Sequence, residues 1–497
     1  MYEPTWDSVS THPLPTWYDD AKLGIFLHWG LYSIPGWAPQ VPNIQELLRT
    51  KGPKAMLWDN PYAEWYLNTM QLPGSPTNIH HVQTYGQDFE YDGFRPAFDE
   101  GSMAADLDEL AGVCAAAGAR YVVLTTKHHE GFTLWPASIP HPRKGFYHAQ
   151  RDIVGDLGAA VRRRDMRMGL YYSGGYDWPF NDAVLSNPAD ASLAVPTGAD
   201  YREYAEAHVR ELIDRYQPSV LWNDICWPGG GNLAELFAHY YNTVTDGVVN
   251  DRWLEAEGDR TAVGDALARG LGSAIQAMWH YIPESAKSLT FPAAHHYDFN
   301  TPEYAKFDHI VTKKWESTRG VGHSFGANRN ERPEDIVTTT ELVRSFSDIV
   351  SKNGNLLIGI GPGPDGRIAD QQAAPLRGLA SWLAVNGEAI YGSRPWDVAA
   401  TETTEGTEVR FTHSGDEVYA ILLDLPGSRT FGLRGVDASA VSDVRLLGVD
   451  EAIAWNVSGR DLTVTLPERV PVAAAYVLSL GRGARAITTE TTTSAAP

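Results

Sequence analysis

Up to residue 392 the chain alternates short apolar runs with longer amphipathic stretches. The clearest apolar runs lie at 24–30 (GIFLHWG), 121–127 (YVVLTTK), 168–173 (MGLYYS) and 219–224 (SVLWND). Weaker ones lie at 247–252, 309–316 (HIVTKKWE) and 355–361. Helical periodicity of apolar residues marks 103–118, 201–216 and 338–350. This alternation predicts an α/β protein with a parallel sheet, and its repetition predicts a (β/α)8-like barrel over residues 1–392.

The pattern changes near residue 393. Short strand-like runs at 408–412, 417–422, 441–446 and 462–466 are separated by turn residues, and helical periodicity disappears. Residues 393–486 are therefore predicted to form a C-terminal antiparallel β-sandwich. The low-complexity end, 487–497, is predicted to be a disordered tail. Residues 254–293 show no regular pattern and resemble an insertion in a loop of the barrel.

Composition and charge narrow the function. Of 497 residues, 43% are hydrophobic and the net charge is −22, which disfavours binding to nucleic acid or to anionic membrane surfaces. The N-terminus lacks the features of a signal peptide, and no apolar run approaches the ~20 residues of a membrane helix. Only two cysteines, Cys114 and Cys226, occur. These features predict a cytoplasmic location and leave the oligomeric state open, a homo-oligomer included.

Aromatic residues make up 11% of the chain, with 16 Trp. Aromatic faces stack on the C–H faces of sugars, so a carbohydrate site is one interpretation. Composition alone favours the other, that these side chains belong to the core and interfaces.

Polar side chains recur at the ends of the predicted strands. In a (β/α)8 barrel the C-terminal strand ends form one rim, and active sites lie there. If the strand assignments hold, one pocket should collect residues from six strands: His28, His128, His129, Tyr171, Asp224, Arg252 and Glu316.

Two of these residues are carboxylates. Asp224 ends a buried strand and is followed by a glycine-rich loop, which favours a functional role over a helix N-cap. Glu316 follows Lys313 and Lys314, and such a run is usually a surface ion-pair cluster. Together, however, Asp224 and Glu316 supply the two carboxylates that glycoside hydrolysis requires.

Metal and nucleotide sites are disfavoured. Barrel metallohydrolases usually carry a His-x-His pair, which this chain lacks, so His128 and His129 are better explained as hydroxyl partners of a sugar. Residues 361–366 (GPGPDG) fit G-x-G-x-x-G, but two of the positions are prolines, which lack the N–H groups that hold phosphate. We therefore predict no cofactor and no metal.

Eight segments, in this order along the chain, carry a resemblance to a known family: PTWYDDAKLGIFLHWGLYSIPGWAP, NPYAEWY, YVVLTTKHHEGFTLW, GLYYSGGYDW, VLWNDICWP, VNDRW, KKWESTRGVGHSFGANRNE and NLLIGIGPGPDG. In combination they resemble the α-L-fucosidases of glycoside hydrolase family 29, from about residue 5 to 395. The resemblance implies a barrel with a C-terminal β-sandwich. It also implies a metal-independent retaining hydrolase that releases terminal α-L-fucose from fucosylated oligosaccharides or glycosides.

The resemblance also implies roles for single residues. Asp224 matches the family's nucleophile and Glu316 its acid/base, with Glu64 as the rival for the second role. Matched sugar contacts are His28, Glu64, Trp65, His128, His129, Tyr171, Trp222 and Arg252, and Phe26 and Trp222 are expected to face the fucose methyl group. The long 254–293 segment departs from the family pattern and leaves the leaving-group preference open. A non-catalytic fucose-binding protein, a retaining glycosidase for another sugar and a transfucosidase remain alternatives.

Overall fold

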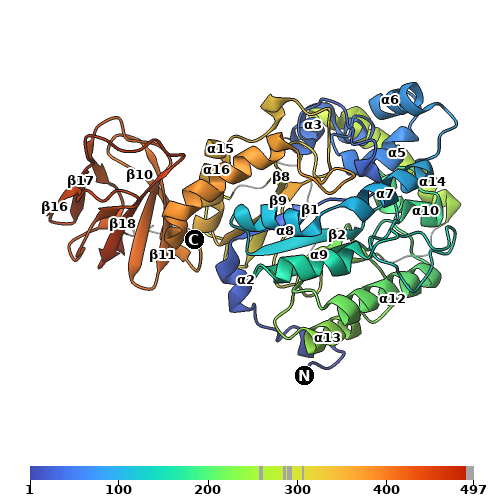
Figure 1. Cartoon of the computed structure of the whole chain (residues 1–497), viewed down its shortest axis with the longest axis horizontal. Helices are drawn as coiled ribbons and strands as arrows, with labels where there is room; N and C mark the ends of the chain where they lie inside the picture. The colour runs from blue at the N-terminus through green and yellow to red at the C-terminus, as the bar shows by residue number, and fades with distance from the viewer. Residues whose placement is uncertain (257–260, 284–286, 288–293, 305–306, 488–497) are drawn as a thin grey trace, which may run out of the picture.

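A seven-stranded parallel sheet forms the centre of the larger part of the chain. The computed structural model describes residues 1–256, 261–283, 287, 294–304 and 307–487 (Figure 1). The strand order is β6-β4-β3-β2-β1-β9-β8. The strands are β1 Leu23–Leu27, β2 Tyr121–Lys127, β3 Arg167–Ser173, β4 Val220–Asp224, β6 Val248–Val249, β8 Trp315–Gly320 and β9 Gly354–Ile360.

The two edges of this sheet, β6 and β8, are joined by an irregular segment around residues 299–303. Parallel bridges connect Asn250 to Phe299, Asn300 to Trp315, and Glu303 to Thr318. These bridges put the segment in the position of the remaining barrel strand. The predicted (β/α)8-like barrel is confirmed, with one side closed by bridges in place of a regular strand.

Helices cover the outside of the barrel, because their apolar stripes pack on the outward-facing residues of the strands (Figure 1). Their ends carry the expected signals: Asp106 caps α8, and Thr338 with Glu341 forms a capping box at α15. The helices are α1 Trp6–Val9, α2 Thr16–Ala21, α3 Ile44–Lys51, α4 Pro53–Trp58, α5 Tyr66–Met70, α6 Pro76–Tyr85, α7 Arg95–Ala104, α8 Leu107–Ala116, α9 Ile153–Arg162, α10 Trp178–Asn181, α11 Asp190–Leu193, α12 Ala199–Tyr216, α13 Leu233–Thr243, α14 Ala262–Met278, α15 Thr339–Ser351 and α16 Asp370–Asn386.

The C-terminal part is a separate antiparallel β domain, seen at the left of Figure 1. One sheet has the order β10-β11-β12-β18-β15 and the other β13-β17-β16, and side chains from both, such as Phe411 and Phe431, share one apolar core. The strands are β10 Arg394–Glu402, β11 Glu408–Ser414, β12 Glu417–Leu422, β13 Thr430–Leu433, β15 Arg445–Leu446, β16 Ala454–Ser458, β17 Asp461–Thr465 and β18 Tyr476–Arg482. This domain packs on the barrel at α15, where Arg410 pairs with Asp348.

Two of the element predictions are wrong. The run 309–316 is not a strand ending at Glu316; β8 begins at Trp315, so Glu316 is its second residue. The pattern misleads because β8 itself reads WESTRG, with polar side chains on both faces. The stretch 254–293 is not irregular throughout, since it contains the 17-residue helix α14.

Parts of the insertion (257–260, 284–286 and 288–293) and almost all of the predicted tail (488–497) lie outside the described residues. Within the described part of the chain, no helix combines the length and the apolar character needed to cross a membrane.

Candidate active site

A small cavity of about 150 Å³ opens at the C-terminal ends of the barrel strands. Nine of the ten residues predicted from the sequence line it: His28, Glu64, Trp65, His128, His129, Tyr171, Trp222, Asp224 and Arg252. They come from the ends of β1, β2, β3, β4 and β6 and from the short helix η2 (Ala63–Trp65). The tenth, Glu316, does not reach the cavity.

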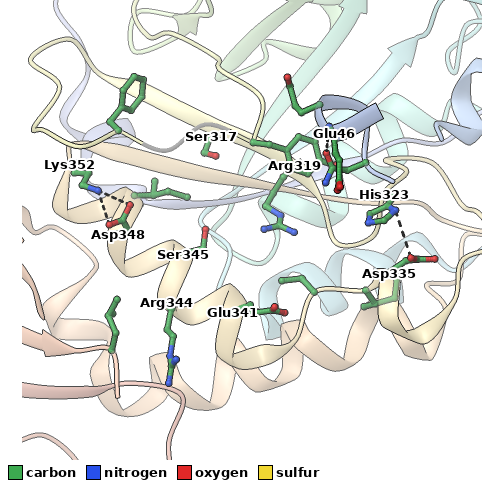
Figure 2. Close-up of a pocket in the computed structure, with 18 of the residues that line it drawn as sticks. Glu46, Ser317, Arg319, His323, Asp335, Glu341, Arg344, Ser345, Asp348 and Lys352 are labelled. Atoms are coloured by element: carbon green, nitrogen blue, oxygen red, sulfur yellow. Dashed lines mark hydrogen bonds and ion pairs between the residues drawn. The ribbon is translucent and has the colours of Figure 1, made fainter. Parts of the chain in front are cut away.

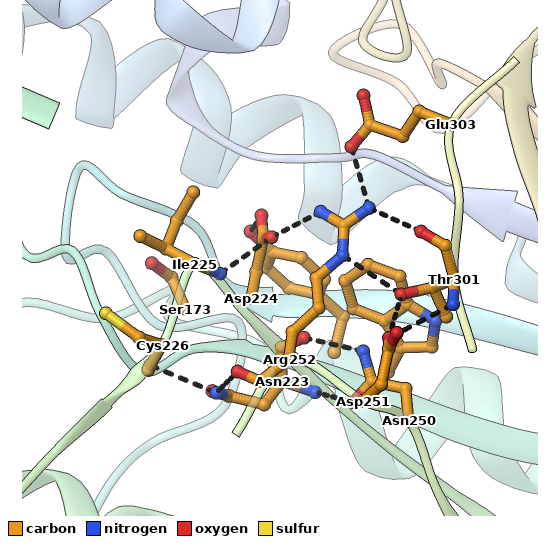
Figure 3. A network of polar contacts seen from close by, with 12 residues as sticks. Ser173, Asn223, Asp224, Ile225, Cys226, Asn250, Asp251, Arg252, Thr301 and Glu303 are labelled. Atoms are coloured by element: carbon orange, nitrogen blue, oxygen red, sulfur yellow. Dashed lines mark hydrogen bonds and ion pairs between the residues drawn. The ribbon is translucent and has the colours of Figure 1, made fainter. Parts of the chain in front are cut away.

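Asp224 ends β4 and is held from three sides (Figure 3). Its Oδ1 accepts hydrogen bonds from Arg252 Nη1 and from the backbone N–H of Ile225, both at 2.8 Å, and its Oδ2 accepts from the Tyr171 hydroxyl at 2.7 Å. Ile225 has a φ of +72°, a strained conformation for a β-branched residue. The Ile225 N–H, Arg252 and Tyr171 together fix the direction of the Asp224 side chain.

Arg252 joins Asp224 to a second carboxylate, Glu303, which no pattern in the sequence indicated. Its Nη2 donates to Glu303 Oε1 at 2.8 Å, while Nε and Nη2 also bind Thr301 (Figure 3). Burial lowers the pKa of the Arg252 guanidinium, but the negative charges of Glu303 and Asp224 raise it by more, so the net shift is upward. One buried cation therefore holds two carboxylates at the same cavity.

Two histidines of the cavity, His28 and His129, are neutral hydrogen-bonding groups. Burial, reinforced by His128, holds the pKa values of His28 and His129 well below 6.5. Ser173 Oγ donates to the Tyr176 carbonyl, so it accepts from His129 Nδ1 at 2.7 Å. The Nε2 atom of His129, 3.9 Å from Asp224 Oδ2, is then left with a lone pair that suits a sugar hydroxyl.

Glu64 and Trp65 reach the cavity from the connection between β1 and β2. Glu64 Oε2 accepts from the Gly326 N–H at 2.8 Å and from Ser324 Oγ at 3.1 Å, and burial raises the pKa of its carboxyl. Trp65 packs edge-on against His129, with ring centroids 5.5 Å apart. Both side chains are therefore fixed by contacts before any ligand enters.

An aromatic wall closes the other side. Phe26 lies 5.2 Å from Trp222 and 6.2 Å from Phe325, measured between ring centroids, and Tyr62 completes the wall against Phe325. Such a wall suits an apolar group such as a methyl. Phe26 and Trp222 were expected here; Tyr62 and Phe325 lie in segments that resemble the family, but neither residue was assigned a role from the sequence.

Glu316 lies below the cavity, inside the barrel, and is fully buried. Its carboxyl accepts from the hydroxyls of Tyr121 (2.5 Å) and Tyr18 (2.8 Å) and from Trp222 Nε1 (3.1 Å). Trp222 stands between it and the sugar space. The expectation that Glu316 meets Asp224 at the rim is corrected, because Glu316 is the second residue of β8 and does not end a strand.

Burial raises the pKa of Glu316 to about 7. The folded protein thus keeps a proton that the unfolded chain loses near pH 4.5, so the stability contributed by this group is complete below 4.5 and is lost as pH rises to about 7. The wild type is therefore about 3 kcal/mol less stable above pH 7 than it would be with this carboxyl protonated.

We expect the stability advantage of Glu316→Gln over the wild type to grow between pH 4.5 and 7 and to stay constant above pH 7. Thermal midpoints across this range test it, with Glu451→Gln as an exposed control; a constant offset at every pH would contradict it.

A larger groove, about 1100 Å³, lies outside the barrel between β8, α3 and α15 (Figure 2). Several of its charged groups already pair with protein groups, such as Lys352 and Arg410, which both bind Asp348. In the part of the chain that the structure describes, no group of three or more His, Cys, Asp or Glu side chains is arranged to hold a metal ion. Convergent polar groups beside an aromatic wall occur at the smaller cavity, which is therefore the candidate active site.

The comparisons with known proteins agree with this geometry. A profile of the α-L-fucosidase family matches residues 1–388, and a profile of the α-L-fucosidase C-terminal domain matches 402–481. The chain belongs to the α-L-fucosidase family. The tissue α-L-fucosidase of Bos taurus is 31% identical over 95% of this chain and 88% of its own length, and the α-L-fucosidase of Branchiostoma floridae is 32% identical over 96% and 95%.

Among solved structures, the α-fucosidase of Thermotoga maritima in complex with a mechanism-based inhibitor is 38% identical, with a TM-score of 0.80 over 96% of this chain and 99% of that chain. The chain is therefore a glycoside hydrolase with α-L-fucosidase activity. The predicted family, fold class and enzyme class are confirmed.

Proposed function

We propose that this α-L-fucosidase is a retaining exo-enzyme that removes terminal α-L-fucose by double displacement. The observation that carries the proposal is the pair of carboxylates, Asp224 and Glu303, held by one guanidinium at a cavity of monosaccharide size. Retaining glycosidases place their two carboxyl groups only about 5–5.5 Å apart, which a shared Arg favours.

In the first step, an Asp224 oxygen attacks the anomeric carbon of fucose. The bond from that carbon to the leaving-group oxygen breaks as Glu303 gives this oxygen its proton, and a covalent fucosyl-enzyme forms. Asp224 is the better nucleophile because its carboxylate is fixed by Arg252, Tyr171 and the Ile225 N–H.

In the second step, Glu303 takes a proton from water, and the water oxygen attacks the anomeric carbon and releases Asp224. While Asp224 is esterified its negative charge is gone, so Arg252 faces the Glu303 carboxylate alone. Glu303 gave its proton to the leaving group in the first step, so it is a carboxylate when it must act as the base. His28, His129 and Glu64 are proposed to bind ring hydroxyls, and Phe26, Trp222 and Phe325 to face the methyl group.

The exo mode follows from the size of the cavity. It has room for about one sugar ring, and its floor is closed by Trp222. If the fucose carried a further sugar on its other side, that sugar would need the space that the floor occupies. Terminal fucose on a glycan or glycoside is therefore the proposed substrate.

A slow 2-fluoro fucosyl fluoride tests the mechanism. We expect one covalent fluorofucosyl group per chain, attached to the peptide that contains Asp224, and regain of activity on prolonged incubation. Mass spectrometry of the digested protein locates the label. A label on a peptide without residue 224, or inverted product seen by NMR at the anomeric proton, would overturn the proposal.

A further inference from the structure

A buried carboxyl remains that the proposed reaction does not use. Glu316 lies in the barrel interior, with no solvent exposure and no Lys, Arg or His of the described chain within ion-pair distance. Its three hydrogen bonds go to Tyr18, Tyr121 and Trp222. An apolar side chain could fill such a position without the free energy that burying a carboxyl requires, so its presence calls for an explanation.

Trp222 connects this carboxyl to the reacting groups. It lies two residues before Asp224 on β4, so both side chains point to the same face of the sheet. Its indole stacks on Tyr171 at 5.5 Å, and the Arg252 guanidinium lies 4.8 Å from the ring centroid. Tyr171 and Arg252 both donate hydrogen bonds to the Asp224 carboxylate, and Arg252 also binds Glu303.

We infer that Glu316 is a positioning residue, which through its hydrogen bond to Trp222 Nε1 fixes the indole under Arg252 and Tyr171 and so sets the places of both reacting carboxylates. The inference rests on the proposed roles of Asp224 and Glu303. The indole has only one N–H, and Glu316 is its hydrogen-bond acceptor. Without that bond the ring keeps its packing but loses the contact that determines its tilt.

The structure offers matched variants. Trp222→Phe removes the N–H and leaves Glu316 in place, whereas Glu316→Leu removes the acceptor. Tyr18→Phe and Tyr121→Phe remove the other hydrogen bonds to the same carboxyl without touching Trp222, so they control for a purely structural role. Glu316→Gln keeps an acceptor oxygen for the indole and is the conservative rescue.

Each variant is measured as kcat and KM per active site, with sites counted by labelling with the slow fluorinated fucoside. We expect Trp222→Phe and Glu316→Leu each to lower kcat/KM by about tenfold or more, the kinetic equivalent of one lost buried hydrogen bond. The double variant should lose no more than the worse single variant, because both remove the same contact. Glu316→Gln should stay within threefold of the wild type, and the two Tyr variants should lower thermal stability without changing kcat/KM.

Additive losses in the double variant, or equal losses of kcat/KM in the Tyr variants, would overturn the inference and leave Glu316 a structural residue. If Glu316→Leu does not fold, Glu316→Ala, which also removes the acceptor and leaves the indole in place, is compared with the two Tyr variants instead. Failure of the proposed function has a different signature: the wild type would then not be labelled at Asp224, whatever the Glu316 variants do.

Discussion

Asp224→Ala is expected to lower kcat/KM for an aryl α-L-fucoside by about 10⁴-fold or more, because no other group can form the bond to the anomeric carbon. The side chain touches Arg252, Tyr171 and its own neighbour Ile225. Arg252 keeps Glu303 and Thr301 as partners in the variant, so the cavity should survive. Steady-state kinetics together with circular dichroism measure the loss and the state of the fold.

Adding azide to the Asp224→Ala variant tests whether Asp224 is the nucleophile. In the alanine variant a small anion fits where the carboxylate was and attacks the same face of the sugar directly. The expected product is β-L-fucosyl azide, with inverted configuration, formed at a rate that rises with azide concentration. Asp224→Asn, which keeps the shape and one acceptor oxygen, should be as inactive as the alanine variant but should not respond to azide. Activity within tenfold of the wild type in either variant would remove Asp224 from the role.

Asp224 could be predicted from the sequence because its surroundings are regular. After Ser219 the run SVLWND is apolar until its last two residues, and the C-terminal end of a buried parallel strand is where barrel enzymes present polar groups. The same rule holds for His128 and His129, which follow directly after β2 and lie side by side at the cavity, with ring centroids 3.9 Å apart. Local pattern and position in the fold agree at these sites.

Glu316 and Glu303 show where that reasoning fails. The sequence around Glu316 presents a carboxylate after an apolar run, but the strand starts there, and the side chain points into the barrel core. Glu303 lies in the irregular segment that closes the barrel, where single bridges replace a strand and no periodicity exists to detect. Its position depends on a bridge to Thr318 in β8 and on Arg252, 51 residues earlier in the chain, which only folding brings near.

The C-terminal domain and α14 show which secondary-structure elements the sequence pattern predicts and which it does not. Strands with alternating apolar residues, such as β11 and β17, were predicted to within about two residues. Helix α14 was missed because Gly264, Gly270 and Gly272 lower its intrinsic helix propensity. Tertiary contacts compensate, since Gly272 packs against Ala189 and Arg269 pairs with Asp190.

In Glu303→Ala, the loss of kcat/KM is expected to depend on the leaving group of the substrate. A sugar leaving group needs the proton that Glu303 provides, so kcat/KM for a fucosylated disaccharide should fall by about 10²–10⁴-fold. A dinitrophenyl fucoside, whose leaving group needs little proton transfer, should keep a rate of fucosyl-enzyme formation near that of the wild type and then release fucose slowly. Pre-steady-state kinetics should show this as a burst of dinitrophenol.

Azide also tests the role of Glu303, and the product expected from Glu303→Ala has the opposite anomeric configuration to that expected from Asp224→Ala. It should attack the accumulated fucosyl-enzyme in place of the water that Glu303 no longer activates, and give α-L-fucosyl azide with retained configuration. Glu316→Ala and Glu64→Ala are the controls, since neither residue is the proposed proton donor. Each should lower kcat/KM for the two substrates by similar factors. If the dependence on the leaving group appears in Glu316→Ala and not in Glu303→Ala, the proton donor is Glu316 after all; if it appears in Glu64→Ala, the donor is the carboxyl beside Trp65.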